Sequence, residues 1–170
     1  AKHIEPEIFL KLKEKSNIAL KTWRLNNLDS PGASWSEDFF MTAEVYGQGT
    51  DNNYYYDNGF DSVINFKFPK GDTLDHLEEI YSEYSNKINT TEDFNVLSYI
   101  SSHDTGLTRG NLINLGTKLL LAPGAIQIYY GDESNRLAST SIITTAVDQG
   151  SRSDMNWDSL DKEVLSHFQK

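Results

Sequence analysis

The sequence predicts an α/β fold in which helices cover a parallel sheet. Short apolar runs alternate four times with longer amphipathic segments along the 170 residues. The short runs are almost continuously apolar, which is typical of strands buried on both faces. With 38% hydrophobic and 12% aromatic residues, the chain has enough apolar side chains for one compact unit with a core.

The first half of the chain predicts a helix followed by two strands. Apolar residues recur at helical spacing from Phe9 to Trp23, after a proline that favours the first turn. The run FFMTAEV at 39–45 reads as a buried strand that ends near Glu44. The run SVINFKF at 62–68 predicts the second strand.

The second half repeats this alternation. Asp72 can cap a helix whose apolar face begins at Leu74. VLSYISS at 96–102 predicts the third strand, NLINLGTKLLL at 111–121 a helix, and AIQIYYG at 125–131 the fourth strand. A long polar stretch from Asp132 to Trp157 separates the fourth strand from a final amphipathic helix, and loops of that size are usually functional or belong to an insertion.

The composition narrows the classes of partner. Twenty-five acidic and 15 basic residues give a formal charge of −10, which disfavours nucleic acid and anionic membranes and fits a neutral substrate better. The absence of cysteine excludes a disulfide framework, a thiol nucleophile and a thiolate zinc site. No apolar run in the sequence is long enough to cross a membrane.

Both ends of the sequence predict a piece of a longer protein. The start, AKHIEPEIF, has neither an initiator methionine nor the features of a leader peptide. The end, LDKEVLSHFQK, stops inside a predicted helix with no glycine cap after it. We therefore expect a fragment of a longer chain, called the parent below.

Residues suited to catalysis follow two of the predicted strands. Glu44 stands at the carboxyl end of the first strand, and His103 and Asp104 stand at the same end of the third. In a parallel barrel the loops at this end converge, so these side chains could face one substrate. Position alone leaves open that Glu44 is a solvated loop acid and that Asp104 caps a helix starting near Gly106.

Three motifs, in the same order, resemble conserved regions of the alpha-amylase family of glycoside hydrolases. The opening Ala1-Lys2-His3 resembles the tail of the family's second region, and MTAEVYGQG resembles the third. FNVLSYISSHDT followed by LLLAPGAIQIYYGDE resembles the fourth region and the eighth barrel strand. The run GSRSDMNW is similar to a segment of bacterial periplasmic-type members, which we expect to be the nearest relatives.

The resemblance implies that residues 1–170 form the later part of a (β/α)8 barrel of the TIM type, about strands five to eight. Such a half-barrel has two open sheet edges and an uncovered layer of core side chains. We therefore expect the N-terminal half of the barrel, or a second copy of the chain, to cover it. The resemblance to bacterial members also implies a periplasmic or secreted parent.

The resemblance further implies the roles of three residues. Glu44 would be the general acid and base, Asp104 would stabilise the transition state, and His103 would hydrogen-bond the glucose at the cleaved bond. The family's nucleophilic aspartate would lie two residues before Ala1, outside this chain. A retaining glycosidase pairs a proton donor with a carboxylate nucleophile about 5 Å away.

Lys2 and His3 would contact sugar on the leaving-group side. This pair is typical of members that cleave internal α-1,4 bonds, so the implied substrate is an alpha-glucan such as starch. In many members the carbonyl group that matches His3 also binds structural calcium. Because the other calcium ligands would come mainly from upstream, calcium is expected only for the parent. Without the resemblance, Lys2 and His3 read as ordinary exposed residues.

Other residues stay open between a sugar contact and a structural role. Five aromatic residues could stack on glucose or act as wedges under loops, namely Trp35, Tyr46, Tyr54, Tyr55 and Tyr56. Three residues after the fourth strand are expected to anchor a loop rather than to catalyse, namely Arg152, Asp154 and Trp157. Asp132 and Glu133 are expected to be rim or supporting acids.

Two rival functions remain at this point. A non-catalytic glucan-binding or scaffold barrel would keep the fold and lose the chemistry, and another hydrolase or transglycosylase of the family would keep both. An aspartate two positions before Ala1 in the parent would favour an enzyme over the scaffold.

Overall fold

The computed structural model describes residues 1, 3–51, 54–71, 76–91, 95–139 and 149–170. It confirms the α/β class and the parallel sheet. Four strands lie in the order β1-β2-β3-β4, and every neighbouring pair is parallel. Their bounds are β1 Thr42–Ala43, β2 Ser62–Asn65, β3 Val96–Tyr99 and β4 Ala125–Gln127.

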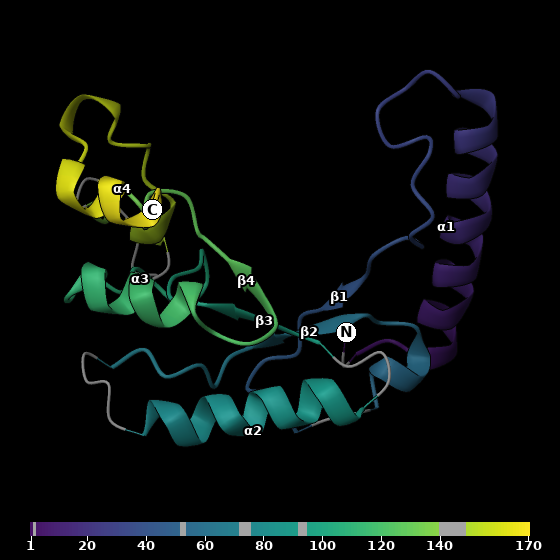
Figure 1. Ribbon diagram of the computed structural model, residues 1–170, viewed down its shortest axis with the longest axis horizontal. Coiled ribbons are helices and arrows are strands. Elements are labelled where there is room, and N and C mark those ends of the chain that lie inside the picture. Colours follow the sequence, from purple (N-terminus) through teal and green to yellow (C-terminus); the bar gives the residue numbers. More distant parts are fainter. Residues whose placement is uncertain (2, 52–53, 72–75, 92–94, 140–148) are drawn as a thin grey trace.

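In Figure 1, α2 runs beneath this sheet, α1 stands at one end of it, and α3 and α4 stand at the other. Their bounds are α1 Pro6–Asn26, α2 Leu77–Thr90, α3 Leu112–Leu120 and α4 Lys162–Phe168. Short 3-10 turns are η1 Tyr56–Asn58, η2 Gln149–Arg152 and η3 Trp157–Ser159. In the described part of the chain, no helix combines the length and hydrophobicity of a membrane span.

Local side-chain caps explain where two helices begin. The side chain of Asn111 accepts a hydrogen bond from the Asn114 amide at 3.1 Å, at the start of α3. Asp161 starts α4 in the same way, accepting from the amide of Val164 at 3.2 Å. The predicted cap Asp72, and with it Leu74, lies outside the described residues.

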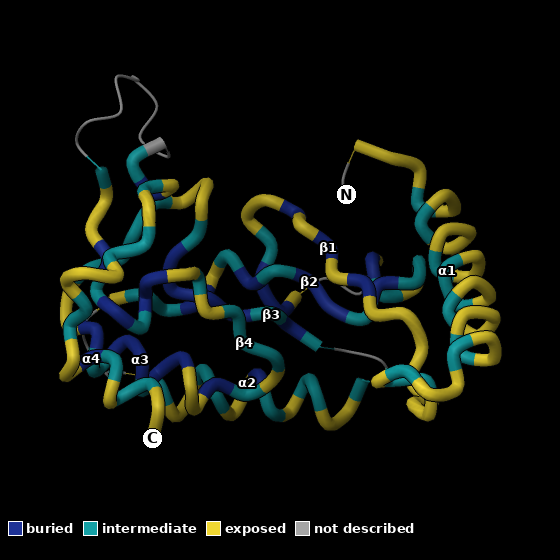
Figure 2. Tube along the Cα trace, turned by 90° about the horizontal axis from the view of Figure 1, so that it is seen from above, coloured by how far each residue is buried: buried dark blue, intermediate teal, exposed yellow. Residues whose placement is uncertain are grey.

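The core consists of two clusters of buried side chains. The first joins β1, β2 and β3 to the loop around η1, through residues such as Ala43, Val63 and Val96. The second packs α2, α3 and α4 together, with Ile100 and Leu115 fully buried at its centre. Figure 2 shows this buried centre in dark blue, while α1 is largely exposed.

The predicted strand at 39–45 is too long. Only Thr42–Ala43 pair with β2, and Phe39 and Phe40 are 43% and 55% exposed. The reason lies in α1, because the Phe39 amide donates to Asn17 and the Phe39 carbonyl accepts from Lys13. These side chains use the backbone groups that a strand would have paired.

The predicted apolar face of the first helix is not buried in this chain. No residue of α1 is buried, and Leu12 and Trp23 are 51% and 43% exposed. Phe9 is partly buried, because its ring packs against that of Phe60. The centroids of the two rings lie 4.8 Å apart.

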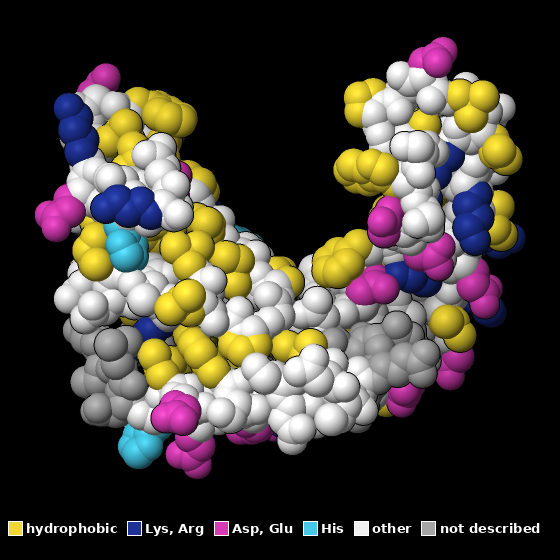
Figure 3. All heavy atoms as spheres, in the orientation of Figure 1, with side chains coloured by type: hydrophobic (Ala, Val, Ile, Leu, Met, Phe, Trp, Pro, Cys, Tyr) yellow, Lys and Arg dark blue, Asp and Glu magenta, His cyan; other side chains and the backbone are white. Residues whose placement is uncertain are grey.

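Figure 3 shows that the molecule is hollowed between the α1 end and the α3–α4 end, with hydrophobic side chains on the floor of the hollow. An open parallel sheet flanked by helices is consistent with part of a TIM-type barrel. The assignment of its strands to barrel positions five to eight, and of residues 1–170 to a partial catalytic barrel, stays a prediction.

Candidate active site

Loops at the carboxyl edge of the sheet bring two predicted site residues together. Glu44 directly follows β1, His103 lies in the loop after β3, and Gln127 ends β4. All three line one small cavity of about 40 Å³. Ile64 and Tyr99 contribute to its walls. The side chains of Glu44 and His103 are exposed, so a substrate can reach them from solvent.

Asp104 lies beside this cavity and has a nitrogen atom close to each of its carboxylate oxygens. Its Oδ2 lies 3.2 Å from Nε2 of His103, and its Oδ1 accepts a hydrogen bond from Nη2 of Arg152 at 2.8 Å. The sequence interpretation assigned Arg152 to loop anchoring and missed this contact. The 48 residues between the partners explain why no local pattern reveals it.

The alternative in which Asp104 caps the following helix is wrong. Asn111 caps that helix, which begins at Leu112. The loop instead turns around Ser102, whose Oγ accepts from the amides of Asp104 at 3.3 Å and Thr105 at 3.0 Å. This turn presents His103 and Asp104 side by side.

A lysine covers the aromatic wall of the cavity. Nζ of Lys70 lies 3.6 Å from the centre of the Tyr99 ring. Burial lowers the pKa of Lys70 to about 8, and the charge of Asp132 opposes this shift. Burial also raises the pKa of Tyr99, and the nearby charge of Glu44 adds to that effect. The cavity is therefore close to a cation whose charge changes just above neutral pH.

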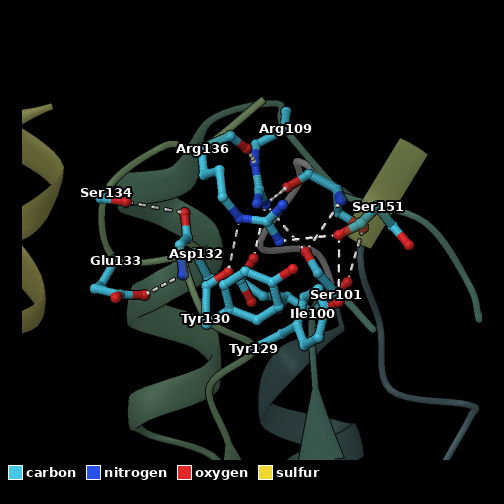
Figure 4. A network of polar contacts seen from close by, with 12 residues as sticks. Ile100, Ser101, Arg109, Tyr129, Tyr130, Asp132, Glu133, Ser134, Arg136 and Ser151 are labelled. Atoms are coloured by element: carbon cyan, nitrogen blue, oxygen red, sulfur yellow. Dashed lines mark hydrogen bonds and ion pairs between the residues drawn. The ribbon is translucent and has the colours of Figure 1, made fainter. Parts of the chain in front are cut away.

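A buried polar network supports the loop after β4 (Figure 4). Asp132 is fully buried and accepts a hydrogen bond from Nη1 of Arg109 at 2.7 Å. Nη1 of Arg109 also donates to Oγ of Ser101 at 3.0 Å, which ties this loop to the end of β3. Burial raises the pKa of Asp132, while hydrogen bonds from Ser101 and Arg109 oppose the shift. Asp132 is thus an interior supporting acid and not a rim acid.

Arg136 is the centre of this network and is only 1% exposed. Its guanidinium carbon lies 3.9 Å from the centre of the Tyr130 ring, and its nitrogens donate to the carbonyl groups of Ser151 and Ser153, each at 3.0 Å. Gly131, with φ +87°, passes so close that an added Cβ would come within 2.5 Å of Arg136. The predicted strand at 125–131 ends at Gln127. Tyr129 and Tyr130, which the prediction included in the strand, have their rings beside the Arg136 guanidinium instead.

Of the two predicted N-terminal contacts, the structure describes only His3. Lys2 lies outside the described residues, and His3 is exposed in a turn and does not line the cavity. The backbone nitrogen of Ala1 nevertheless donates to the carbonyl oxygen of Glu44 at 2.9 Å. Ala1 therefore lies against the residue that directly follows β1.

The calcium site at His3 stays a prediction. Calcium takes about six to eight oxygen ligands, of which the His3 carbonyl group is one. Among the described residues, no group of three or more His, Asp or Glu side chains could hold a metal ion.

The five aromatic residues divide between structural and exposed positions. Tyr55 is buried in the first core cluster, and Tyr56 packs against it and donates from its hydroxyl to the Asn95 carbonyl. Tyr46 is 77% exposed, and its ring lies 5.4 Å from that of Phe66, which lines the cavity. Trp35 lines a different pocket, next to the end of α1. Tyr54 is 50% exposed and lines another pocket, together with Tyr55. Tyr46 is thus the one of the five that is both exposed and beside the cavity.

An open parallel sheet with acids and a histidine at the carboxyl ends of its strands defines an α/β protein consistent with part of a TIM-type barrel. Over its whole length, in an alignment of 177 residues, the chain is 39% identical to the periplasmic alpha-amylase of Escherichia coli (strain K12). The chain spans 25% of the length of that protein. No family model matches the chain. The whole-chain similarity confirms the resemblance and is consistent with a fragment of the alpha-amylase family.

Proposed function

We propose that this chain is part of a longer retaining alpha-amylase, to which it contributes the general acid and base. The observation that carries the proposal is the cavity lined by both Glu44 and His103, in a chain 39% identical to a protein named alpha-amylase. The proposed substrate is an alpha-glucan, and the proposed reaction is hydrolysis of internal α-1,4 bonds in starch, glycogen or maltodextrin.

In the proposed reaction, Glu44 protonates the glycosidic oxygen while a carboxylate nucleophile attacks the anomeric carbon. The bond to the leaving sugar breaks, and a covalent glycosyl intermediate forms. Glu44 then removes a proton from water, whose oxygen attacks the same carbon and releases the product. Asp104 stabilises the positive charge that develops on the sugar ring, and His103 hydrogen-bonds that sugar.

The proposed nucleophile is an aspartate two residues before Ala1 in the parent. The hydrogen bond from the Ala1 nitrogen to the Glu44 carbonyl supports this position, because it sets the chain entering at Ala1 beside β1. A residue shortly upstream would then lie at the same sheet edge as Glu44. Lys2 and His3 would contact the leaving sugar, and Tyr46 would offer a stacking surface.

For the parent we propose a periplasmic or secreted location, in line with the similarity to a periplasmic alpha-amylase. Calcium is proposed only with ligands that other parts of the parent supply. The proposed cover for the open sheet is the N-terminal half of the barrel, or a second copy of the chain. The largely exposed α1, with 55% exposure at Ile8 and 74% at Leu25, supports such a cover.

The proposal is tested by assaying the parent and its Glu44→Gln variant on amylose. Loss of a general acid should lower kcat by about 100-fold or more, because the leaving oxygen must then depart unprotonated. Glu7→Gln, on the exposed surface of α1, is the matched control and should keep wild-type activity. Wild-type activity in Glu44→Gln would refute the role of Glu44, and a parent that binds amylose without cleaving it would favour the scaffold.

The stereochemistry of the reaction is tested separately. A retaining enzyme should release products with the α configuration, which proton NMR can detect before mutarotation. Release of β products would contradict the retaining mechanism, while long transfer products would indicate a transglycosylase.

A further inference from the structure

A contact between distant parts of the chain holds Asp104 at the candidate site. Arg152, the last residue of η2, donates from Nη2 to Oδ1 of Asp104 at 2.8 Å. The second carboxylate oxygen, Oδ2, lies 3.2 Å from Nε2 of His103.

The turn that carries Arg152 is held by contacts that do not involve Asp104 (Figure 4). Ser151 is 1% exposed, and its carbonyl accepts hydrogen bonds from Arg136 at 3.0 Å and from the Tyr129 hydroxyl at 3.2 Å. On the other side of Arg152, the Ser153 carbonyl accepts from the Tyr130 hydroxyl at 2.9 Å. Hydrogen bonds therefore hold the backbone on both sides of Arg152, independently of the contact between its side chain and Asp104.

The same turn also holds the main chain next to Asp104. Oγ of Ser151 donates to the carbonyl oxygen of His103 at 2.9 Å. One turn thus fixes both the backbone of the loop after β3 and the carboxylate that this loop carries. A general loop anchor would need only the first of these contacts.

The ion pair is too exposed to contribute much to folding. The side chains of Arg152 and Asp104 are 38% and 46% exposed, and pairs in such positions add little to stability because water and salt screen them. The ion pair can nevertheless orient the Asp104 carboxylate. A charge that stabilises a transition state acts best when it is held in place beforehand.

We propose that Arg152 is a positioning residue that fixes the Asp104 carboxylate toward the sugar ring and acts through Asp104 rather than on the sugar. This inference rests on the proposed function. A sugar hydroxyl can replace His103 at Oδ2 while Arg152 continues to hold Oδ1. The loop after β4 thereby sets the geometry of a residue on the loop after β3.

The test is a double-mutant cycle in the parent, with Arg152→Gln, Asp104→Asn and the double variant. The substrate is α-maltotriosyl fluoride, whose leaving group needs no protonation, so that slow variants stay measurable. Arg152→Gln should lower kcat about 10-fold or more and change KM by less than about 3-fold. In the Asp104→Asn background the same change should cost less than about 2-fold.

Two further variants separate positioning from folding and from sugar binding. Arg152→Lys keeps a positive charge without the planar donor pair and should fall between wild type and Arg152→Gln. Arg24→Gln removes an arginine that donates to the Glu37 carbonyl, near the far end of α1, and should leave kcat unchanged. Melting temperatures should be the same for Arg152→Gln and wild type within about 2 °C.

Three outcomes would overturn the inference: equal losses in both backgrounds, a higher KM at unchanged kcat, or a rate loss matched by a lower melting temperature. Failure of the proposed function looks different, because the wild-type parent would then cleave neither amylose nor the fluoride. In that case a crystal structure of the parent decides the pairing, and a distance well beyond hydrogen-bond range between Arg152 and Asp104 would overturn it.

Discussion

At the scale of single residues, Lys70 gives the candidate site its most distinctive electrostatic property. The pKa of Lys70 in the folded chain is about 8, against 10.5 in an unfolded chain, because burial disfavours the charged ammonium. Between these values the folded state binds fewer protons than the unfolded state, so stability rises with pH across this window. The unfavourable effect of burying the charge is fully present below about pH 8.

Replacing Lys70 with methionine should therefore change the pH dependence of stability. Lys70→Met keeps a side chain of similar length and removes the charge that lies over the Tyr99 ring. Its unfolding free energy, relative to wild type, should be most favourable near about pH 7 and should lose this advantage as the pH rises to about 10. Denaturant unfolding of the parent at a series of pH values measures the difference. Parallel profiles for the two proteins would contradict the assigned pKa.

The residues of the candidate site were predictable to different degrees. Glu44 and His103 were found because each stands at the end of an apolar run in the sequence, and the carboxyl ends of parallel strands meet at one edge. The contact of Arg152 with Asp104 and the role of Arg136 could not be found in this way, because their partners are fixed only once the chain has folded. Local patterns describe neighbours in the sequence, and the contact of Arg152 spans 48 residues.

At the scale of secondary-structure elements, the order and direction of the strands followed from the alternation of apolar runs and amphipathic segments. The lengths of the strands did not follow from it. The apolar run at 39–45 predicted a strand of about seven residues, whereas β1 has two. Phe39 and Phe40 are apolar and yet lie outside the strand, because side chains of α1 bind the backbone there. Hydrophobicity reports the tendency to be buried, and strand pairing also needs free backbone groups.

The loop after β4 depends on the buried guanidinium of Arg136, so Arg136→Lys should loosen it. Lysine cannot reach Tyr130, Ser151 and Ser153 at once, and a loss of about 2 kcal/mol in stability is expected from hydrogen bonds left unmade. Hydrogen exchange of the amides at 149–156 in the parent should become faster, while amides of α2 should change little. Arg24→Lys, at a half-buried arginine near the end of α1, serves as the control. Unchanged exchange at 149–156 would show that Arg136 does not hold this loop.

At the scale of the whole molecule, the open sheet predicts that the isolated 170-residue chain is not a well-folded monomer. β1 and β4 are the two edges of the sheet, and α1 leaves large apolar side chains in solvent. Size-exclusion chromatography with light scattering should therefore show association, and near-ultraviolet circular dichroism should be weak in any monomer. A monodisperse monomer with sharp thermal unfolding would contradict this expectation.

The whole molecule also makes a prediction about activity. If the nucleophile lies before Ala1, the isolated chain should not cleave amylose even at high concentration, whereas the parent should. The assay is the release of reducing ends, with the purified parent as the positive control. Turnover by the purified chain would show that its own residues supply the nucleophile.

The strand order β1-β2-β3-β4 has a consequence for how the protein is made. Each strand pairs with the strand synthesised just before it, and all pairs are parallel. A nascent chain leaving the ribosome can thus add one strand and its helix at a time, without waiting for a distant segment. Every intermediate on that route carries an exposed growing edge. Nascent chains arrested after β2 or β3 should therefore aggregate more readily when chaperones are depleted. This sensitivity should end once another part of the protein covers the last sheet edge.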